Sequence, residues 1–287
     1  MKLRYLASYT APAFYLLRKM HLFLNRNHSA GGVRILLYHH IPENKRELFK
    51  NQLNCLANNY QFITPVQFQD FMEGRCFFSD LKLLITFDDA FKSSRFVSEE
   101  VLQPLGIKGV FFVPTDFIEL TDNGRQKDFI AQKIFDKNIL ESFITPDMKP
   151  LTWKDLEFLT EQGHVIGSHA KTHSRLSNPH SKDELYDEII ESGNLLEKKL
   201  GVAIDYFAYP FGDIDSINKP AMELIKQRYR YCFSGIRGIN NPFRSSYTIL
   251  RDTVYIDDPP MYVRLIIEGG IDSLYRRKIL RLLELVK

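Results

Sequence analysis

Short apolar runs alternate with longer amphipathic stretches along most of this chain. Six runs have the composition of strands: VRILLYHH (33–40), KLLITFDD (82–89), GVFFVPT (109–115), HVIGSH (164–169), DYFAYPFG (205–212) and YRYCFSG (229–235). Several of them are almost continuously apolar, which is typical of a parallel sheet covered by helices on both faces.

The stretches between these runs have helical spacing. They cover residues 46–58, 65–73, 92–104, 126–141, 152–162, 182–200 and 219–228. Thr152 with Asp155, and Ser181 with Glu184, have the spacing of capping boxes at helix starts. Because strands and helices alternate throughout, the pattern predicts a parallel β/α barrel or a doubly wound α/β sheet.

Composition excludes several classes of protein. The chain has 287 residues, 44% of them hydrophobic, which allows a real core and excludes collagen, low-complexity disorder and coiled coil. Its three cysteines, Cys55, Cys76 and Cys232, cannot form a disulfide framework and lack zinc-ribbon spacing. We therefore expect them to be buried free thiols.

The net charge of +3 argues against a nucleic-acid partner, but it hides an uneven distribution. Residues 1–42 carry six basic side chains and no acidic one, and residues 274–287 carry five basic and one acidic. The middle of the chain, 43–273, therefore has a net charge of −7. Basic, partly apolar ends around an acidic middle indicate contact between the ends and an anionic surface.

The N-terminal stretch from residue 3 to 24 is apolar, but its least polar part is too short to span a bilayer. It fits a cleaved signal peptide, an interfacial amphipathic segment or a helix packed on the domain, and no good cleavage site follows it. The C-terminal run SLYRRKILRLLELVK has helical spacing and fits either a core-covering helix or a membrane-surface helix. Peripheral membrane association, at the cytoplasmic face or through an uncleaved anchor, is favoured over cleaved secretion.

Two adjacent carboxylates, Asp88 and Asp89, end the apolar run LLITF. Buried carboxylates are costly unless they are paired or bind a cation, and active sites of parallel β/α folds lie at the carboxyl ends of strands. One of them could instead cap a helix while the other is solvated.

Two histidines four residues apart, His169 and His173, follow another predicted strand. In a helix or tight loop both imidazoles can face one point, although two unrelated histidines remain an alternative. With Asp89 they supply two nitrogens and one oxygen, the ligand set of a catalytic zinc with one open position.

A third apolar run ends in Tyr209-Pro210-Phe211-Gly212. Such a turn can direct a backbone N–H into a cleft that aromatic rings enclose, or it can be a simple turn. Tyr209 and Phe211 are also candidates for stacking on sugar rings.

Together these motifs resemble those of the polysaccharide deacetylases with the NodB-homology fold, carbohydrate esterase family 4. The family's TFDDG motif corresponds to residues 86–90, its G-H-E-I-G-S/N-H-x-x-x-H block to 163–173, and its F-A-Y-P-Y-G motif to 207–212. The resemblance covers roughly 33–255. It implies one α/β domain, a distorted (β/α)7-type barrel, over residues 33–257, with an N-terminal extension (1–32) and a C-terminal helical segment (258–287).

The resemblance also implies roles. Asp89, His169 and His173 would hold a divalent metal, in the first place zinc, with cobalt, nickel or manganese as alternatives. Asp88 would be the general base that activates water at the metal. The metal and the turn that contains the backbone N–H of Phe211 would stabilise the oxyanion.

The sequence departs from the family pattern at four points, one of which is Phe211 in place of the family's usual tyrosine. Ala90 replaces the glycine after the two aspartates, and Ala208 stands where many members have an arginine that orients the base. The family's C-terminal general-acid histidine is missing, because no histidine follows His180. The best substitute is His39, preferred to His40, because Tyr-His at this place resembles the circularly permuted poly-N-acetylglucosamine deacetylases.

These observations predict a metal-dependent hydrolase that removes N-acetyl groups from N-acetylhexosamine residues of a bacterial surface or lipid-linked glycan. A carbohydrate O-acetyl esterase remains an alternative, since the same chemistry would serve it. A glycan-binding module with weak or no catalysis is a second alternative, favoured mainly by the missing arginine. A membrane-surface scaffold would not explain the metal-binding motifs.

Overall fold

The computed structural model describes residues 10, 12–13, 16, 31–135 and 144–287. The predicted N-terminal extension lies almost wholly outside the described residues. Among those that are described, no helix has the length and apolarity needed to cross a bilayer.

Eight strands form one sheet in which every pair is parallel. They are β1 (Val33–Tyr38), β2 (Gln61–Phe62), β3 (Lys82–Phe87), β4 (Gly109–Val113), β5 (Val165–Ser168), β6 (Tyr206–Ala208), β7 (Tyr231–Phe233) and β8 (Asp252–Thr253). Their order is β7-β6-β5-β4-β3-β1-β8, and β2 pairs with the start of β3.

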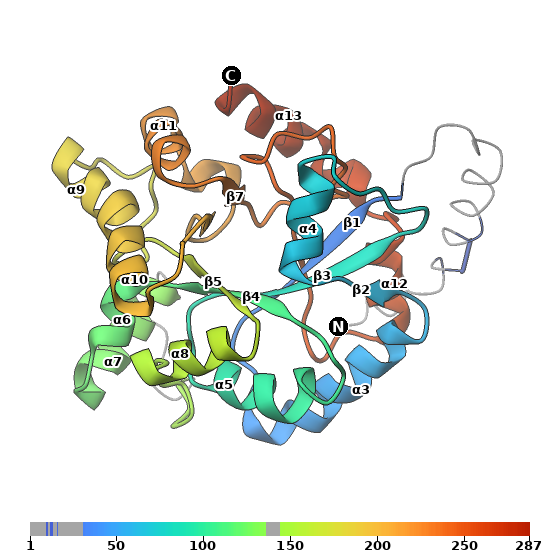
Figure 1. The fold of residues 1–287 in the computed structure, drawn as a ribbon, viewed down its shortest axis with the longest axis horizontal. Helices are drawn as coiled ribbons and strands as arrows, with labels where there is room; N and C mark the ends of the chain where they lie inside the picture. The colour runs from blue at the N-terminus through green and yellow to red at the C-terminus, as the bar shows by residue number, and fades with distance from the viewer. Residues whose placement is uncertain (1–9, 11, 14–15, 17–30, 136–143) are drawn as a thin grey trace.

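The segment around β8 joins the two edges of this sheet. Ile249 bridges to Phe233 of β7, and three residues later β8 pairs with Leu36 and Leu37 of β1. The sheet therefore curls into the distorted (β/α)7-type barrel that the resemblance implied, with helices around its outside (Figure 1).

The α-helices are α3 (Arg46–Ala57), α4 (Pro65–Met72), α5 (Ser93–Val97), α6 (Thr115–Glu119), α7 (Asn123–Phe129), α8 (Trp153–Glu161), α9 (Lys182–Tyr186), α10 (Ser192–Leu200), α11 (Lys219–Arg228), α12 (Pro260–Ile267) and α13 (Arg276–Leu285). Short π-helical turns at Ser98–Leu102, Ile130–Ile134 and Asp187–Glu191 extend α5, α7 and α9. Single 3₁₀ turns lie at Glu43–Lys45, Ile214–Ser216 and Asp272–Tyr275. Both predicted capping boxes are present, at the starts of α8 and α9.

Apolar side chains form two main layers. The outer layer lies between the strands and the surrounding helices and includes Leu36, Leu83 and Phe207. The inner layer fills the barrel, where Phe112 and Phe233 pack with Phe68 and other residues of α4. The barrel interior is therefore a packed core, as in other parallel β/α barrels.

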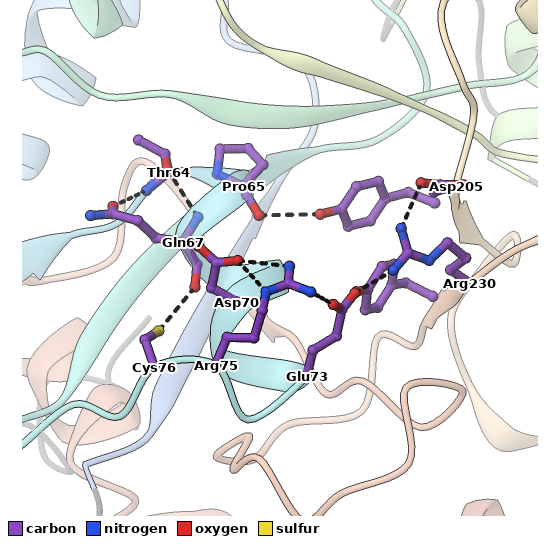
Figure 2. Close-up of polar contacts among 11 residues, drawn as sticks. Thr64, Pro65, Gln67, Asp70, Glu73, Arg75, Cys76, Asp205 and Arg230 are labelled. Carbon is purple, nitrogen blue, oxygen red and sulfur yellow. Dashed lines mark hydrogen bonds and ion pairs between the residues drawn. The ribbon is translucent and has the colours of Figure 1, made fainter.

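Helix α4 closes the end of the barrel where the strands begin. The hydroxyl of Tyr206, the first residue of β6, donates to the Pro65 carbonyl (3.2 Å), and that of Tyr231, the first residue of β7, donates to the Glu73 carboxylate (2.5 Å). Figure 2 shows the surrounding ion pairs, in which Arg230 reaches both Glu73 and Asp205. Because this end is filled and bonded, a ligand must enter from the opposite, carboxyl end of the strands.

The C-terminal residues 258–287 pack on the barrel. Val263 and Ile266 of α12 and Leu282 of α13 are fully buried. Of the three cysteines, only Cys232 is buried, whereas Cys55 is exposed and Cys76 is partly exposed. The expectation of three buried thiols is therefore wrong for Cys55, which lies on the solvent side of α3, and for Cys76, which is only partly buried.

Candidate active site

The two aspartates lie at the carboxyl edge of the sheet, directly after β3. Both are buried, Asp88 3% and Asp89 4% exposed, and both line one pocket. Asp89 has φ 71°, a left-handed conformation that turns the chain sharply. This turn brings two adjacent carboxylates to one cleft, where a continuing strand would point them to opposite faces.

The two histidines follow β5, which lies two strands away from β3. The loop that carries them has left-handed residues at Ala170 (φ 63°) and His173 (φ 58°). One side-chain atom each of Asp89, His169 and His173 can serve as a ligand, and these atoms all lie within 4.8 Å of one another. The structure therefore brings the three predicted ligands together.

Backbone carbonyls set the tautomers of both imidazoles. Nδ1 of His169 lies 2.6 Å from the Ala208 carbonyl oxygen, and Nδ1 of His173 lies 2.8 Å from that of Lys133. A carbonyl only accepts, so Nδ1 carries the proton in each ring and the Nε2 lone pair is free in the neutral form. This outer hydrogen bond is the usual arrangement behind a metal-binding histidine.

The ligand distances fit a divalent metal. Oδ1 of Asp89 lies 3.2 Å from Nε2 of His173 and 3.6 Å from Nε2 of His169. Ligands about 2.0–2.1 Å from a tetrahedral zinc are about 3.4 Å apart. The residues present therefore suit such an ion with little rearrangement.

Charge couples these groups strongly. Burial opposes ionisation of Asp89, but His169 and His173, which can donate from Nε2 when their rings are protonated, outweigh burial and hold the pKa of this carboxyl well below its usual range. Burial likewise opposes a charged His169, yet the nearby Asp88 and Asp89 raise the pKa of that imidazole. The site is an acidic cleft that attracts positive charge.

Asp88 is held by an arginine that the sequence did not identify. Arg251, fully buried just before β8, donates to the two carboxylate oxygens of Asp88 at 2.6 and 2.8 Å. Burial alone would raise the pKa of Asp88, but Arg251, with a smaller effect from His169, holds it below its ordinary value. Asp88 is thus kept ionised and fixed in orientation, as a general base requires.

Arg251 therefore binds the carboxylate of Asp88, the role that the resemblance gives to an arginine that this sequence lacks at Ala208. The sequence does place Arg251 directly after the apolar run 247–250, as it places Asp88 after a longer apolar run. This pattern was too weak to predict Arg251 as a site residue, because β8 has only two residues.

A second unforeseen residue, Glu188, supports the histidine loop. It is 5% exposed and accepts hydrogen bonds from the backbone N–H groups of Lys171 (3.0 Å) and Thr172 (2.9 Å) and from the Thr172 hydroxyl (2.5 Å). These three bonds fix the segment between His169 and His173.

The turn after β6 is divided between core and pocket. Tyr209 is 0% exposed and packs in the outer core layer, and Pro210 is also buried, whereas Phe211 and Gly212 line the pocket. The prediction that the Tyr209 ring could stack on a sugar is therefore wrong. Phe211 has φ 64°. The centroid of its ring lies 4.8 Å from that of His173 and 3.9 Å from the guanidinium carbon of Arg175.

The two histidines after β1 differ in their surroundings. His39 is exposed, lines the pocket, and lies near enough for its charge to lower the pKa of both Asp88 and Asp89. His40 is held by Ser93 (3.0 Å) and Asp147 (3.4 Å), and burial lowers its pKa. Of the two, His39 is free to meet a substrate.

The pocket has a volume of about 520 Å³. Its polar residues include Asp88, Asp89, His169, His173, Arg251 and His39, and its apolar ones include Ile41, Ile134, Phe135, Met148 and Ile256. A pocket lined by both charged and apolar side chains suits a small polar group that is part of a larger ligand.

Known structures share this fold. IcaB from Ammonifex degensii is similar with a TM-score of 0.64 and 21% identity, over 84% of this chain and 98% of that one. The deacetylase PplD from Streptococcus pyogenes is similar with a TM-score of 0.64 and 19% identity, over 83% and 99% of the two chains. A de-N-acetylase from Aggregatibacter actinomycetemcomitans has a TM-score of 0.62 and 19% identity, over 82% and 99%.

A comparison with curated proteins gives no match. The family model for polysaccharide deacetylases, however, matches residues 79–229, more than half of the chain. That stretch contains both aspartates, both histidines and Phe211, whereas His39 and Arg251 lie outside it. This chain therefore belongs to the polysaccharide deacetylase family and is a carbohydrate-deacetylating hydrolase.

Proposed function

We propose that the protein is a metal-dependent deacetylase that hydrolyses the N-acetyl amide of N-acetylhexosamine residues in a bacterial surface or lipid-linked glycan. The observation that carries this proposal is the convergence of Asp89, His169 and His173 beside an ionised, arginine-held Asp88 in one pocket. The name of the de-N-acetylase among the similar structures supports N-deacetylation over the O-acetyl alternative.

Asp89 and the Nε2 atoms of His169 and His173 would hold the divalent metal, zinc in the first place. A metal in such a site lowers the pKa of water and polarises a carbonyl group. Asp88 accepts the proton of the attacking water, because Arg251 keeps its carboxylate ionised and aimed. The backbone N–H of Phe211 donates to the oxygen of the acetyl group as negative charge develops there.

His39 donates a proton to the nitrogen as the C–N bond breaks. The water oxygen is then bonded to the acetyl carbon, so the products are acetate and a free amine on the sugar. Arg251 also removes the main support for a non-catalytic binding module, because it binds Asp88 as the arginine missing at Ala208 was expected to do.

Acetate release from an oligomer of N-acetylglucosamine, measured with wild type and Asp88→Asn loaded with zinc, tests this proposal. We expect wild type to release acetate and Asp88→Asn to lose at least about 100-fold in kcat, since a general base contributes about 10²–10⁴-fold. Release unchanged by the substitution would refute the role of Asp88. An O-acetylated sugar assayed in parallel distinguishes the esterase alternative.

The role of His39 has its own test. His39→Ala should lower kcat with zinc still bound, whereas His40→Ala should lower it much less. If His39→Ala turns over at the wild-type rate with zinc bound, another group donates the proton.

A further inference from the structure

The two faces of helix α13 serve different purposes. Inward, Leu282 is fully buried and packs with Ile279 and Leu285 against the barrel residues Ile214 and Leu250. Outward, the helix and the turn before it expose a set we call the α13 face: Leu274, Arg276, Arg277, Leu280 and Arg281. Leu274 is 76% exposed and Leu280 is 54% exposed.

The basic residues of α13 differ in their partners among the described residues. Lys278 pairs with Asp213 (2.6 Å), and Arg281 pairs with Asp215 (2.7 Å). Arg276 and Arg277 make no ion pair with any described residue. Within the described part of the chain, two exposed guanidinium groups without an acidic partner therefore lie close in sequence to two exposed leucines.

Strand β1 contacts the turn that leads into α13. Arg34 of β1 pairs with Asp272 (2.5 Å), which lies in the turn that leads into α13. Residues 1–32, which precede that strand, carry five basic side chains and no acidic one. Because like charges repel, neither this segment nor the same face of a second copy complements the α13 face, but an anionic surface complements both.

We propose that the α13 face docks on an anionic lipid bilayer. The leucines would enter the interfacial region, and the guanidinium groups would pair with phosphate headgroups. Figure 1 shows α13 on the outside of the barrel, where a flat surface can reach it. Gly212 lines the pocket and the next residue, Asp213, binds Lys278, so the docked membrane lies beside the pocket rim.

Co-sedimentation of the full chain with vesicles tests this docking without any assay of catalysis, so its outcome is independent of the proposed function. Vesicles of phosphatidylglycerol and phosphatidylcholine are compared with vesicles of phosphatidylcholine alone. We expect binding to the anionic vesicles that weakens as salt is raised. Arg276→Glu with Arg277→Glu should lower the partition coefficient about 30-fold or more, and Leu274→Ser with Leu280→Ser should lower it without changing its salt dependence.

Lys198→Glu with Lys199→Glu is the matched control, because it reverses two adjacent exposed charges on another helix, α10. It should change the partition coefficient less than twofold. If the partition coefficient falls equally in the Arg276/Arg277 and Lys198/Lys199 variants, net charge alone explains binding. If it falls only in a variant with Arg18→Glu and Lys19→Glu, the N-terminal segment binds the vesicles. Either result overturns the proposal. So does unchanged vesicle binding accompanied by dissociation of an oligomer in the Arg276/Arg277 variant, which would make the face a contact between copies.

Discussion

At the scale of single residues, the site depends on Arg251 as much as on the residues of the family motifs. A guanidinium that binds both oxygens of one carboxylate fixes its orientation as well as its charge. Lysine at this position keeps the charge but cannot make the same forked contact.

Arg251→Lys should therefore lower kcat/KM about 10–100-fold, because the carboxylate of Asp88 is no longer held in position. Asp88 acts only when ionised, and Arg251 holds its pKa low. Loss of the forked contact should therefore move the acidic limb of the pH–rate profile to higher pH.

Arg34→Lys is the matched control for this change, because Arg34 is also buried and makes a forked contact, to Asp272. It should leave the acidic limb unchanged even if it destabilises the fold. A wild-type profile for Arg251→Lys would mean that Asp88 needs no orienting partner.

His164, a buried histidine away from the pocket, should make the stability of the fold sensitive to acid. Nδ1 of His164 accepts from the Gly109 N–H (3.0 Å), so its Nε2 carries the proton and bonds Ser98 (2.8 Å). Burial, with a smaller effect from Lys108, lowers the pKa of His164 to about 4. The unfolded chain binds a proton here below pH 6.5 while the folded chain does not, so stability falls as the pH drops from 6.5 to about 4.

Urea unfolding should show about 2 kcal/mol less stability at pH 5 than at pH 7 from this histidine. His164→Gln removes the titrating group, so it should be less stable than wild type at pH 7 but lose less on acidification. His180→Gln should keep the wild-type difference. An identical pH dependence in His164→Gln would contradict this assignment.

At the scale of elements, strands were easier to predict than the segment that closes the barrel. All six long apolar runs became strands because each is buried on both sides, and the motifs at their ends located Asp88, Asp89, His169 and His173. β2 and β8 have two residues each, too few to show a pattern, so Arg251 was missed. The Tyr209 side chain was misplaced because sequence does not show which side of a turn faces the core.

The helical turn at Asp187–Glu191 predicts a further effect on the metal site. Glu188 binds three groups of the loop between His169 and His173, and groups that orient metal ligands typically contribute about 10–100-fold to metal affinity. Glu188→Gln keeps the shape but replaces an acceptor oxygen with an NH₂ group facing N–H donors. We expect zinc affinity, measured by competition with a chelator, to fall about 10–100-fold.

Glu191→Gln, an exposed change three residues along the same turn, is the control and should bind zinc like wild type. Equal affinities in Glu188→Gln and wild type would show that the loop holds its shape without the carboxylate.

At the scale of the whole molecule, the site is made by closure of the barrel. Asp89 comes from the end of β3, the histidines from the end of β5, and the arginine from the segment that joins β7 to β1. Unfolding separates these groups, so an ion that binds all three ligands binds the folded state preferentially. Its binding free energy should therefore appear as stability of the entire chain.

Thermal unfolding with and without zinc measures this coupling. At a zinc concentration about 100 times the dissociation constant, the folded state gains about 2.7 kcal/mol, which should raise the Tm by several degrees, and a chelator should reverse the gain. Asp89→Asn and His173→Gln should abolish the shift, because each removes a ligand. Asp88→Asn should keep most of the zinc-dependent Tm shift, since Asp88 is bound by Arg251 and is proposed to act as base. If Asp88→Asn and Asp89→Asn lose the shift equally, both carboxylates are metal ligands, and the proposed role of Asp88 as base loses its support.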